Sequence, residues 1–230
     1  MKDNKKHKKA EYGILITGLI ILLAATFVTA LCAGQYSVSV PEVTKILASR
    51  FVNVTKTWSN TAEGVVFTLR LPRIIGAVLV GSALSLSGAA YQGVFKNPLV
   101  APDLLGVSSG ACVGASVAIL LHLNSFGVQA MAFVAGILAV GLTLFIPRLI
   151  KNTNMTMLVL SGIIVKGIMD SVMGIIKYVA DPETELQSIT YWQLGSLTKV
   201  LPKDLFTVGP VIVAALVIIF LLRWRINILS

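Results

Sequence analysis

The chain has 230 residues, of which 56% are hydrophobic and only 13% are charged. A water-soluble domain carries about 25% charged residues, so this composition excludes a soluble globular protein and indicates an integral membrane protein. The apolar runs are long and unbroken, without the strict alternation of a transmembrane β-barrel. The sequence therefore predicts an all-α fold, a polytopic bundle of transmembrane helices.

The charged residues comprise 19 Lys and Arg against 10 Asp and Glu, a net charge of +9. In a membrane protein such an excess reports on orientation rather than on nucleic-acid binding. Cys32 and Cys112 both lie in apolar segments, where two free thiols are expected instead of a disulfide. The two histidines, His7 and His122, are far apart in the sequence, so we expect no protein-bound metal or haem.

The apolar runs predict six membrane spans of about 20 residues each. They lie near residues 13–33, 72–92, 104–123, 128–147, 158–179 and 205–222. A basic N-terminal head, residues 1–12, precedes them, and residues 13–225 form one transmembrane domain. The first run is too long for a signal peptide, and Leu31 stands where a lipoprotein signal needs a small residue, which favours a retained span.

Six spans place both ends of this chain on the same side of the membrane. The positive-inside rule favours the cytoplasm for that side, because its basic residues crowd the helix ends. Residues 35–68, together with Arg70 and Arg73, then lie on the outer side. The two arginines run against the rule there, and this marks them as candidates for function.

Small residues recur at helical spacing in the second and third spans, where they allow helix backbones to approach closely in lipid. The candidate packing positions are Gly81, Ser85, Gly88, Gly93, Gly106, Gly110 and Gly114. Between these spans, Pro98 and Pro102 interrupt any continuous helix. Residues 97–102 are therefore expected to form a structured cytoplasmic turn.

Several ordered motifs resemble one known family. They are Leu69-Arg70-Leu71-Pro72-Arg73, residues 81–88, Gln92, Asn97-Pro98-Leu99, Pro102, residues 105–111 and residues 191–197. In this order and spacing they are similar to the FecCD/BtuC family of permease subunits of binding-protein-dependent ABC importers. The resemblance implies import of an iron-siderophore, haem or cobalamin across the bacterial plasma (inner) membrane. The residues themselves leave the choice of chelate open.

The resemblance also implies partners for this chain: a separate ABC ATPase subunit, an extracytoplasmic substrate-binding protein, and a second permease copy or a homologous permease. The sequence has no G-x-x-x-x-G-K-[ST] pattern, so the partner subunit is expected to use the ATP. We therefore expect this chain to be no enzyme and to bind no cofactor.

The family fold has ten spans, whereas this sequence shows about six and stops at Ser230, where the resemblance places the cytoplasmic coupling segment. The expectation is an N-terminal portion or a truncated product. The alternative to an importer permease is then a truncated, non-transporting membrane scaffold. The reading frame downstream of Ser230 would separate the two.

Arg70 and Arg73 are implied by the resemblance to dock the binding protein through its acidic residues. Guanidinium groups suit this task, because they hold carboxylates in a fixed geometry. The alternative is that both side chains anchor the helix by extending to the lipid headgroups.

Two further groups of residues are candidates for the translocation path. Lys166 and Asp170 lie four apart on the fifth span and are expected to pair, either as a lining of the path or as an intrahelical ion pair. Asn154, Met155 and Thr156 fall where the family narrows its cytoplasmic gate. A plain polar loop is the alternative for these three.

Overall fold

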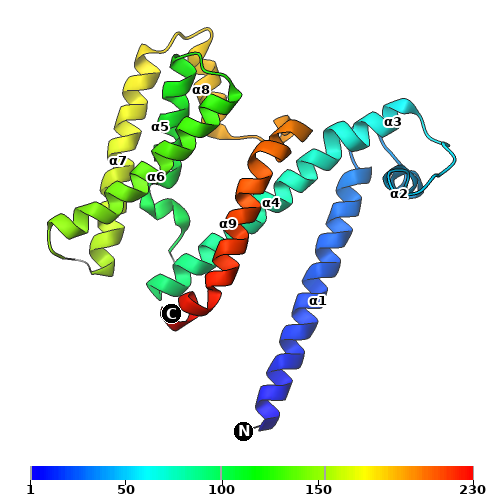
Figure 1. The fold of residues 1–230 in the computed structure, drawn as a ribbon, viewed down its shortest axis with the longest axis horizontal. Helices are drawn as coiled ribbons and strands as arrows, with labels where there is room; N and C mark the ends of the chain where they lie inside the picture. Colours follow the sequence, from blue (N-terminus) through cyan, green and yellow to red (C-terminus); the bar gives the residue numbers. More distant parts are fainter. Residues whose placement is uncertain (1, 99, 153, 230) are drawn as a thin grey trace. The chain divides into compact units, whose positions relative to one another are not determined.

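The computed structural model describes residues 2–98, 100–152 and 154–229. The chain divides into two compact units, Met1–Val80 with Leu197–Ile212, and Gly81–Ser196 with Val213–Ser230. The elements in chain order (Figure 1) are α1 (Lys2–Cys32), α2 (Val40–Ala48), α3 (Asn60–Gly64), the π-helix η1 (Val65–Arg70), α4 (Leu71–Phe95), the 3₁₀-helix η2 (Pro102–Leu105), α5 (Val107–Leu120), α6 (Ser125–Leu149), α7 (Met155–Val179), α8 (Glu185–Leu194), the 3₁₀-helix η3 (Leu197–Lys199) and α9 (Pro202–Leu229). The predicted all-α fold is confirmed.

Within the described residues, five helices are long and apolar enough to cross a membrane. They are Glu11–Cys32, Asn60–Phe95, Ser125–Leu149, Met155–Val179 and Pro202–Asn227. The polytopic transmembrane class is thus confirmed. The third predicted span is different, because its α-helix, α5, has only 14 residues.

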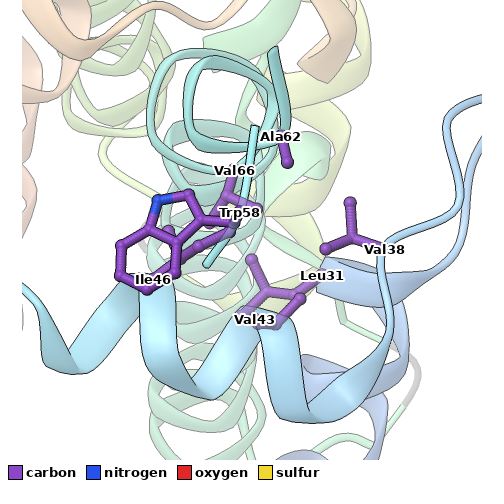
Figure 2. Close-up of a cluster of buried hydrophobic side chains, with 7 residues drawn as sticks. All are labelled: Leu31, Val38, Val43, Ile46, Trp58, Ala62 and Val66. Carbon is purple, nitrogen blue, oxygen red and sulfur yellow. The ribbon is translucent and has the colours of Figure 1, made fainter. Parts of the chain in front are cut away.

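In the first unit, the end of α1 and the segment that follows it build a small apolar core. Its buried members (Figure 2) are Leu31, Val38, Val43, Ile46, Trp58, Ala62 and Val66. Pro41 stands in the first turn of α2, where its missing N–H costs no helical hydrogen bond. At the start of α3, the Ser59 hydroxyl accepts a hydrogen bond from the Ala62 N–H at 3.0 Å. The polar segment after α1 is therefore folded onto this core.

In the second unit, the helices α5, α6 and α7 pack against one another, α5 most closely against α6 (Figure 1). A Cβ atom added at Gly110 would lie 2.5 Å from the Cβ of Ala139, and one added at Gly114 would lie 2.3 Å from the Met131 carbonyl oxygen. Neither distance is sterically allowed. Small residues on α5 thus set how closely it approaches α6, as expected where lipid supplies no hydrophobic drive between helices.

The turn between α4 and α5 enters the space between α6 and α7. The carbonyl oxygen of Leu105, the last residue of η2, accepts a hydrogen bond at 3.0 Å from the hydroxyl of Thr143. Thr143 lies about 9 Å along α6 from its last residue, at 1.5 Å per residue. On α7, the Gly162 backbone is so close to the Leu104 carbonyl that a Cβ atom would lie 1.9 Å from its oxygen.

This re-entrant turn explains why α5 is short. Fourteen residues rise about 21 Å, well short of the roughly 30 Å of a hydrocarbon core. The four residues of η2 add about 8 Å at roughly 2 Å each. The chain after the prolines therefore continues as η2, packed against α6 and α7, and α5 alone is too short to cross the hydrocarbon core.

The Gly114 contact predicts a large effect of a single methyl group. Gly114→Ala should push α5 away from α6 and lower the stability of the chain in detergent by about 1–3 kcal/mol, the usual cost of overpacking. The measurement is the midpoint of unfolding with increasing denaturing detergent.

Gly141→Ala on α6 is the matched control, because no atom lies within 4 Å of its added Cβ. The control should leave the midpoint unchanged or raise it. Equal midpoints for the two variants would show that the α5–α6 approach is not limited by Gly114.

Candidate functional site

Arg70 ends a π-helix, a wide helical turn with one extra residue. The N–H of Leu71 bonds the carbonyl of Val66, five residues back, and α4 then continues with Pro72 as its second residue. Since Pro72 has no N–H, the helix loses a backbone bond at this position in any case. The π-turn falls where that bond would be missing, and turns of this type are frequent at functional sites.

The Arg70 guanidinium binds the carboxyl-terminal end of α1. Its Nη1 donates to the carbonyl oxygens of Leu31 at 2.7 Å and Cys32 at 3.2 Å, and its Nη2 donates to the carbonyl of Tyr36. The last carbonyls of a helix have no partner within the helix, and they carry the negative end of its dipole. Arg70 therefore caps α1 with a positive charge.

Arg70 and Arg73 line one pocket, but their surroundings in it differ. The pocket has a volume of about 500 Å³ and is lined by Ala30, Ala33, Gly34, Gln35, Tyr36, Val65, Leu69, Arg70, Arg73 and Ile74. The Nε of Arg73 is buried and has no hydrogen-bond partner among the described residues. The structure thus brings together both arginines singled out from the sequence, and it gives them different surroundings.

Lys166 forms an ion pair with Asp103 of η2, at 3.1 Å between Nζ and Oδ2. This corrects the expected intrahelical pair with Asp170, which makes no ion pair within the described chain. An acidic residue placed after the lysine is the weaker order for a pair on one helix face. The re-entrant turn instead brings Asp103 to Lys166, about 16 Å along α7 from its first residue.

Helix α7 presents three faces, as successive side chains turn by about 100°. Gly162, Val165, Met173 and Ile176 are buried against the unit. The exposed remainder includes one face that carries the polar residues Lys166, Gly167, Asp170, Ser171 and Gly174, called here the polar face, on which Leu160, Ile163 and Tyr178 also lie. The other exposed face is apolar, with Ile164, Ile168, Ile175 and Val179. Charged groups at membrane depth face the bundle interior or water. The second face is suited to lipid.

Asn154 is the residue that precedes α7, and Met155 and Thr156 open the helix. All three side chains are exposed. Asn154 donates its backbone N–H to the Asn152 side chain at 3.3 Å and makes no side-chain cap. The gate role stays a prediction for these three residues.

The candidate packing residues fall into two groups in the structure. Gly110 and Gly114 contact α6, and Gly106 ends η2 with φ +73°, a left-handed conformation that favours glycine. The other four lie on α4: within the described residues, an added Cβ would have no neighbour within 4 Å at Gly81 or Gly88, and Ser85 is exposed and Gly93 half-buried. The packing role of the α4 row stays a prediction.

The far end of α7 is closed by the short helix α8. Ile189 of α8 is fully buried with Met173, Ile176 and Ala180. In the connecting turn, the Thr184 hydroxyl and the Glu183 N–H hydrogen-bond Asp181, and they lower the pKa of its carboxyl group. Glu185, the first residue of α8, faces His122 at 3.4 Å. Among the described residues, no cluster of three metal-binding side chains occurs.

Sequence reasoning missed Asp103, Thr143 and Gly162. Asp103 stands one residue before the predicted third span, so a charge at a span boundary was the available signal. Nothing in the sequence pattern indicated the roles of Thr143 and Gly162. Each role depends on a backbone carbonyl of η2, which is far away along the chain.

These features define a class: a multi-pass helical membrane protein with a re-entrant turn and a charged helix face. The FecCD transport family model matches residues 21–230. The chain belongs to this family.

Named relatives carry different cargoes. The "Molybdate import system permease protein MolB" of Haemophilus influenzae is 34% identical over 95% of this chain and 64% of that protein. The "Probable iron chelatin transport system permease protein" of Helicobacter pylori is 40% identical over 72% of this chain and 50% of that protein. A solved structure of a transporter assigned to the metal-chelate ABC type, facing inward, matches with TM-score 0.79 and 30% identity, over 95% of this chain and 65% of that one. This chain thus spans half to two thirds of their length.

The ion pair predicts a charge-swap result. Asp103→Lys should lower the yield of folded protein severalfold, because it sets two positive charges at one point in the bundle. Combining it with Lys166→Asp should restore the yield, since the pair is re-formed in reverse.

Asp170→Asn serves as the control, and it should keep the original yield. A double variant as poor as Asp103→Lys alone, measured by size-exclusion chromatography in detergent, would rule out a pairwise interaction.

The polar face of α7 predicts access to water. In a background without Cys32 and Cys112, Asp170→Cys should react with a membrane-impermeant thiol reagent, whereas Ile168→Cys on the apolar face should not. Mass spectrometry of the labelled chain gives the extent of reaction. Similar labelling at both positions would contradict the division of the exposed surface into two faces.

Proposed function

We propose that this chain is a permease subunit of a binding-protein-dependent ABC importer that moves an iron chelate, such as an iron-siderophore, into the cell. The observation that carries the proposal is the FecCD family match over residues 21–230. The relative named for iron chelatin and the metal-chelate transporter structure support an iron chelate as cargo. The relative named for molybdate supplies the competing cargo to be tested.

The transport step needs a path that is polar, and it needs helices that can move. The face of α7 with Lys166, Asp170 and Ser171 supplies polar side chains at membrane depth. In our proposal it lines the path, and Asn154, Met155 and Thr156 lie at its cytoplasmic end. The chain breaks no covalent bond: it would expose the path to either side in turn as bound partners change conformation.

In this proposal, other protein chains supply the energy for transport and capture the cargo. The sequence has no G-x-x-x-x-G-K-[ST] pattern, so a partner ATPase on the cytoplasmic side would bind and hydrolyse ATP. A substrate-binding protein outside the membrane would deliver the chelate. A second permease copy, or a homologous permease, would complete the walls of the path.

Transport by the assembled importer is the direct test of the proposal. Proteoliposomes with the permease, its ATPase and its binding protein should accumulate a radiolabelled ferric chelate when ATP is supplied to the ATPase side. Accumulation should stop with a non-hydrolysable ATP analogue. Uptake of molybdate or cobalamin in preference to the ferric chelate would refute the proposed cargo, and no uptake at all would refute transport.

The proposed location is the bacterial plasma (inner) membrane, with both ends of this chain in the cytoplasm. Introduced cysteines at Lys96 and Lys151 should then be protected from an impermeant reagent in intact cells, and cysteines at Lys56 and Lys199 should be labelled. The background again lacks Cys32 and Cys112. Labelling at position 151 from outside the cell would indicate the opposite orientation.

A further inference from the structure

We propose that the turn after α2 is a membrane anchor, in which Phe51 and Val52 insert among phospholipids and Arg50 meets their phosphate groups. The three residues Arg50, Phe51 and Val52 are called the anchor turn below. Its partner is the lipid of the leaflet that meets the end of α1. The anchor holds the first unit to the membrane surface whether or not the chain is an importer subunit.

The anchor turn presents two neighbouring apolar side chains away from the protein. Phe51 is 90% exposed and Val52 is 64% exposed. The backbone beneath them is held in place, because the N–H groups of both residues donate to the Ala48 carbonyl at 2.9 Å. Adjoining apolar side chains in water are unfavourable, and such patches mark contact sites for membranes or proteins. The turn therefore needs a partner.

The core of the first unit places α2 at the membrane surface. Leu31, in the last turn of α1, lies in one buried cluster with Val43 and Ile46 of α2, and Figure 2 shows the two α2 side chains directed into that cluster. The apolar segment Glu11–Cys32 of α1 is long enough to cross a membrane, so its last turn lies where the chain leaves the lipid. The anchor turn follows α2 directly and shares this level.

The direction of α2 also fits the surface of a membrane. Figure 1 shows α1 along its length and α2 nearly end-on, so α2 runs across the direction of the span. An amphipathic helix that lies in the membrane interface has this orientation. Since the apolar side of α2 is used by the protein core, the apolar contact with lipid falls to the anchor turn.

The charges of this segment favour phospholipid headgroups. Residues 40–58 contain the basic residues Lys45, Arg50 and Lys56 and one acidic residue, Glu42. The guanidinium carbon of Arg50 lies 4.9 Å from the centre of the Phe67 ring, which holds this positive charge beside Phe51. An apolar aromatic ring next to a cation suits the boundary between acyl chains and phosphates.

Lipid fits the anchor turn better than a partner protein does. Stable protein interfaces bury about 1,200 Å² or more, which two apolar side chains cannot supply. A membrane anchor needs only a few apolar groups, because the first span already keeps the turn next to the lipid.

Photo-crosslinking identifies what contacts the anchor turn. Benzoylphenylalanine, which retains the aromatic ring, replaces Phe51 in the chain reconstituted in nanodiscs of phosphatidylcholine and phosphatidylglycerol. The same residue replaces Ile20, exposed on α1 within the span, as the lipid reference, and Thr61, exposed on α3, as the control in water. Mass spectrometry after irradiation should find lipid adducts at position 51 close to those at position 20 and severalfold above those at position 61.

A second set of variants separates the anchor from the lipid affinity of the crosslinker itself. With benzoylphenylalanine in place of Val52, Phe51→Asp should lower the yield of lipid adducts severalfold, because a carboxylate is unfavourable among acyl chains. Phe51→Leu is the matched control and should keep the yield. Neither change should alter the midpoint of unfolding in detergent, since Phe51 is exposed in the folded chain.

The role of Arg50 is tested by the kind of lipid captured. With benzoylphenylalanine at position 51, Arg50→Gln should lower the ratio of phosphatidylglycerol to phosphatidylcholine adducts by about threefold, because one basic residue near the surface is lost. The total yield of lipid adducts should stay nearly the same. An unchanged ratio would remove Arg50 from the anchor.

Other results would overturn the proposal as a whole. Equal lipid adducts at positions 51 and 61 would place the turn in water. Adducts at position 51 to a second copy of the chain, or to an added binding protein in place of lipid, would assign the turn to a protein interface. An unaffected yield in Phe51→Asp would attribute the adducts to the crosslinker, and a lowered unfolding midpoint would show that Phe51 packs within the protein.

Discussion

A polar group at membrane depth must find its partner inside the protein, because lipid offers none. The second unit is organised by this constraint. The Leu105 carbonyl, at the end of η2, lies where a helix cannot supply its bond, and Thr143 of α6 donates to it. Asp103 on the same short helix meets Lys166 of α7. Both contacts hold the re-entrant turn between α6 and α7. The polar groups of the turn thus find their partners on these two helices, and the same contacts fix the position of the turn.

The same constraint acts on α5 through its length. A helix of 14 residues cannot cross a hydrocarbon core alone. If it ended in lipid, the backbone N–H and C=O groups at that helix end would have no hydrogen-bond partner. Packing η2 between α6 and α7 solves both problems, but it requires close backbone approach. Gly162 of α7 provides that approach for η2, toward Leu104, and Gly114 provides it for the following helix α5, toward Met131 of α6. The small residues and the ion pair are therefore parts of one arrangement.

The sequence was sufficient for the features that depend on composition and local spacing. Long apolar runs predicted the all-α polytopic class, and Pro98 with Pro102 predicted the break after α4. It was not sufficient where the partner lies far away along the chain. Lys166 was expected to pair with Asp170 because helical spacing is visible in a sequence, whereas its contact with Asp103 depends on a turn entering the bundle. The different surroundings of Arg70 and Arg73 were likewise hidden, since one motif contains both.

The separation of the two arginines follows from the backbone rather than from the side chains. In a regular α-helix, residues three apart share a face, so Arg70 and Arg73 would point the same way. The π-turn adds a residue just before α4 begins, and Pro72 stands where a regular helix would require an N–H that proline lacks. The altered helix directs Arg70 to the carbonyls at the end of α1, and the buried Nε of Arg73 has no acceptor within the described part of the chain. A proline and an extra residue in the turn thus accompany two different surroundings: Arg70 caps α1, and Arg73 keeps an Nε without a partner among the described residues.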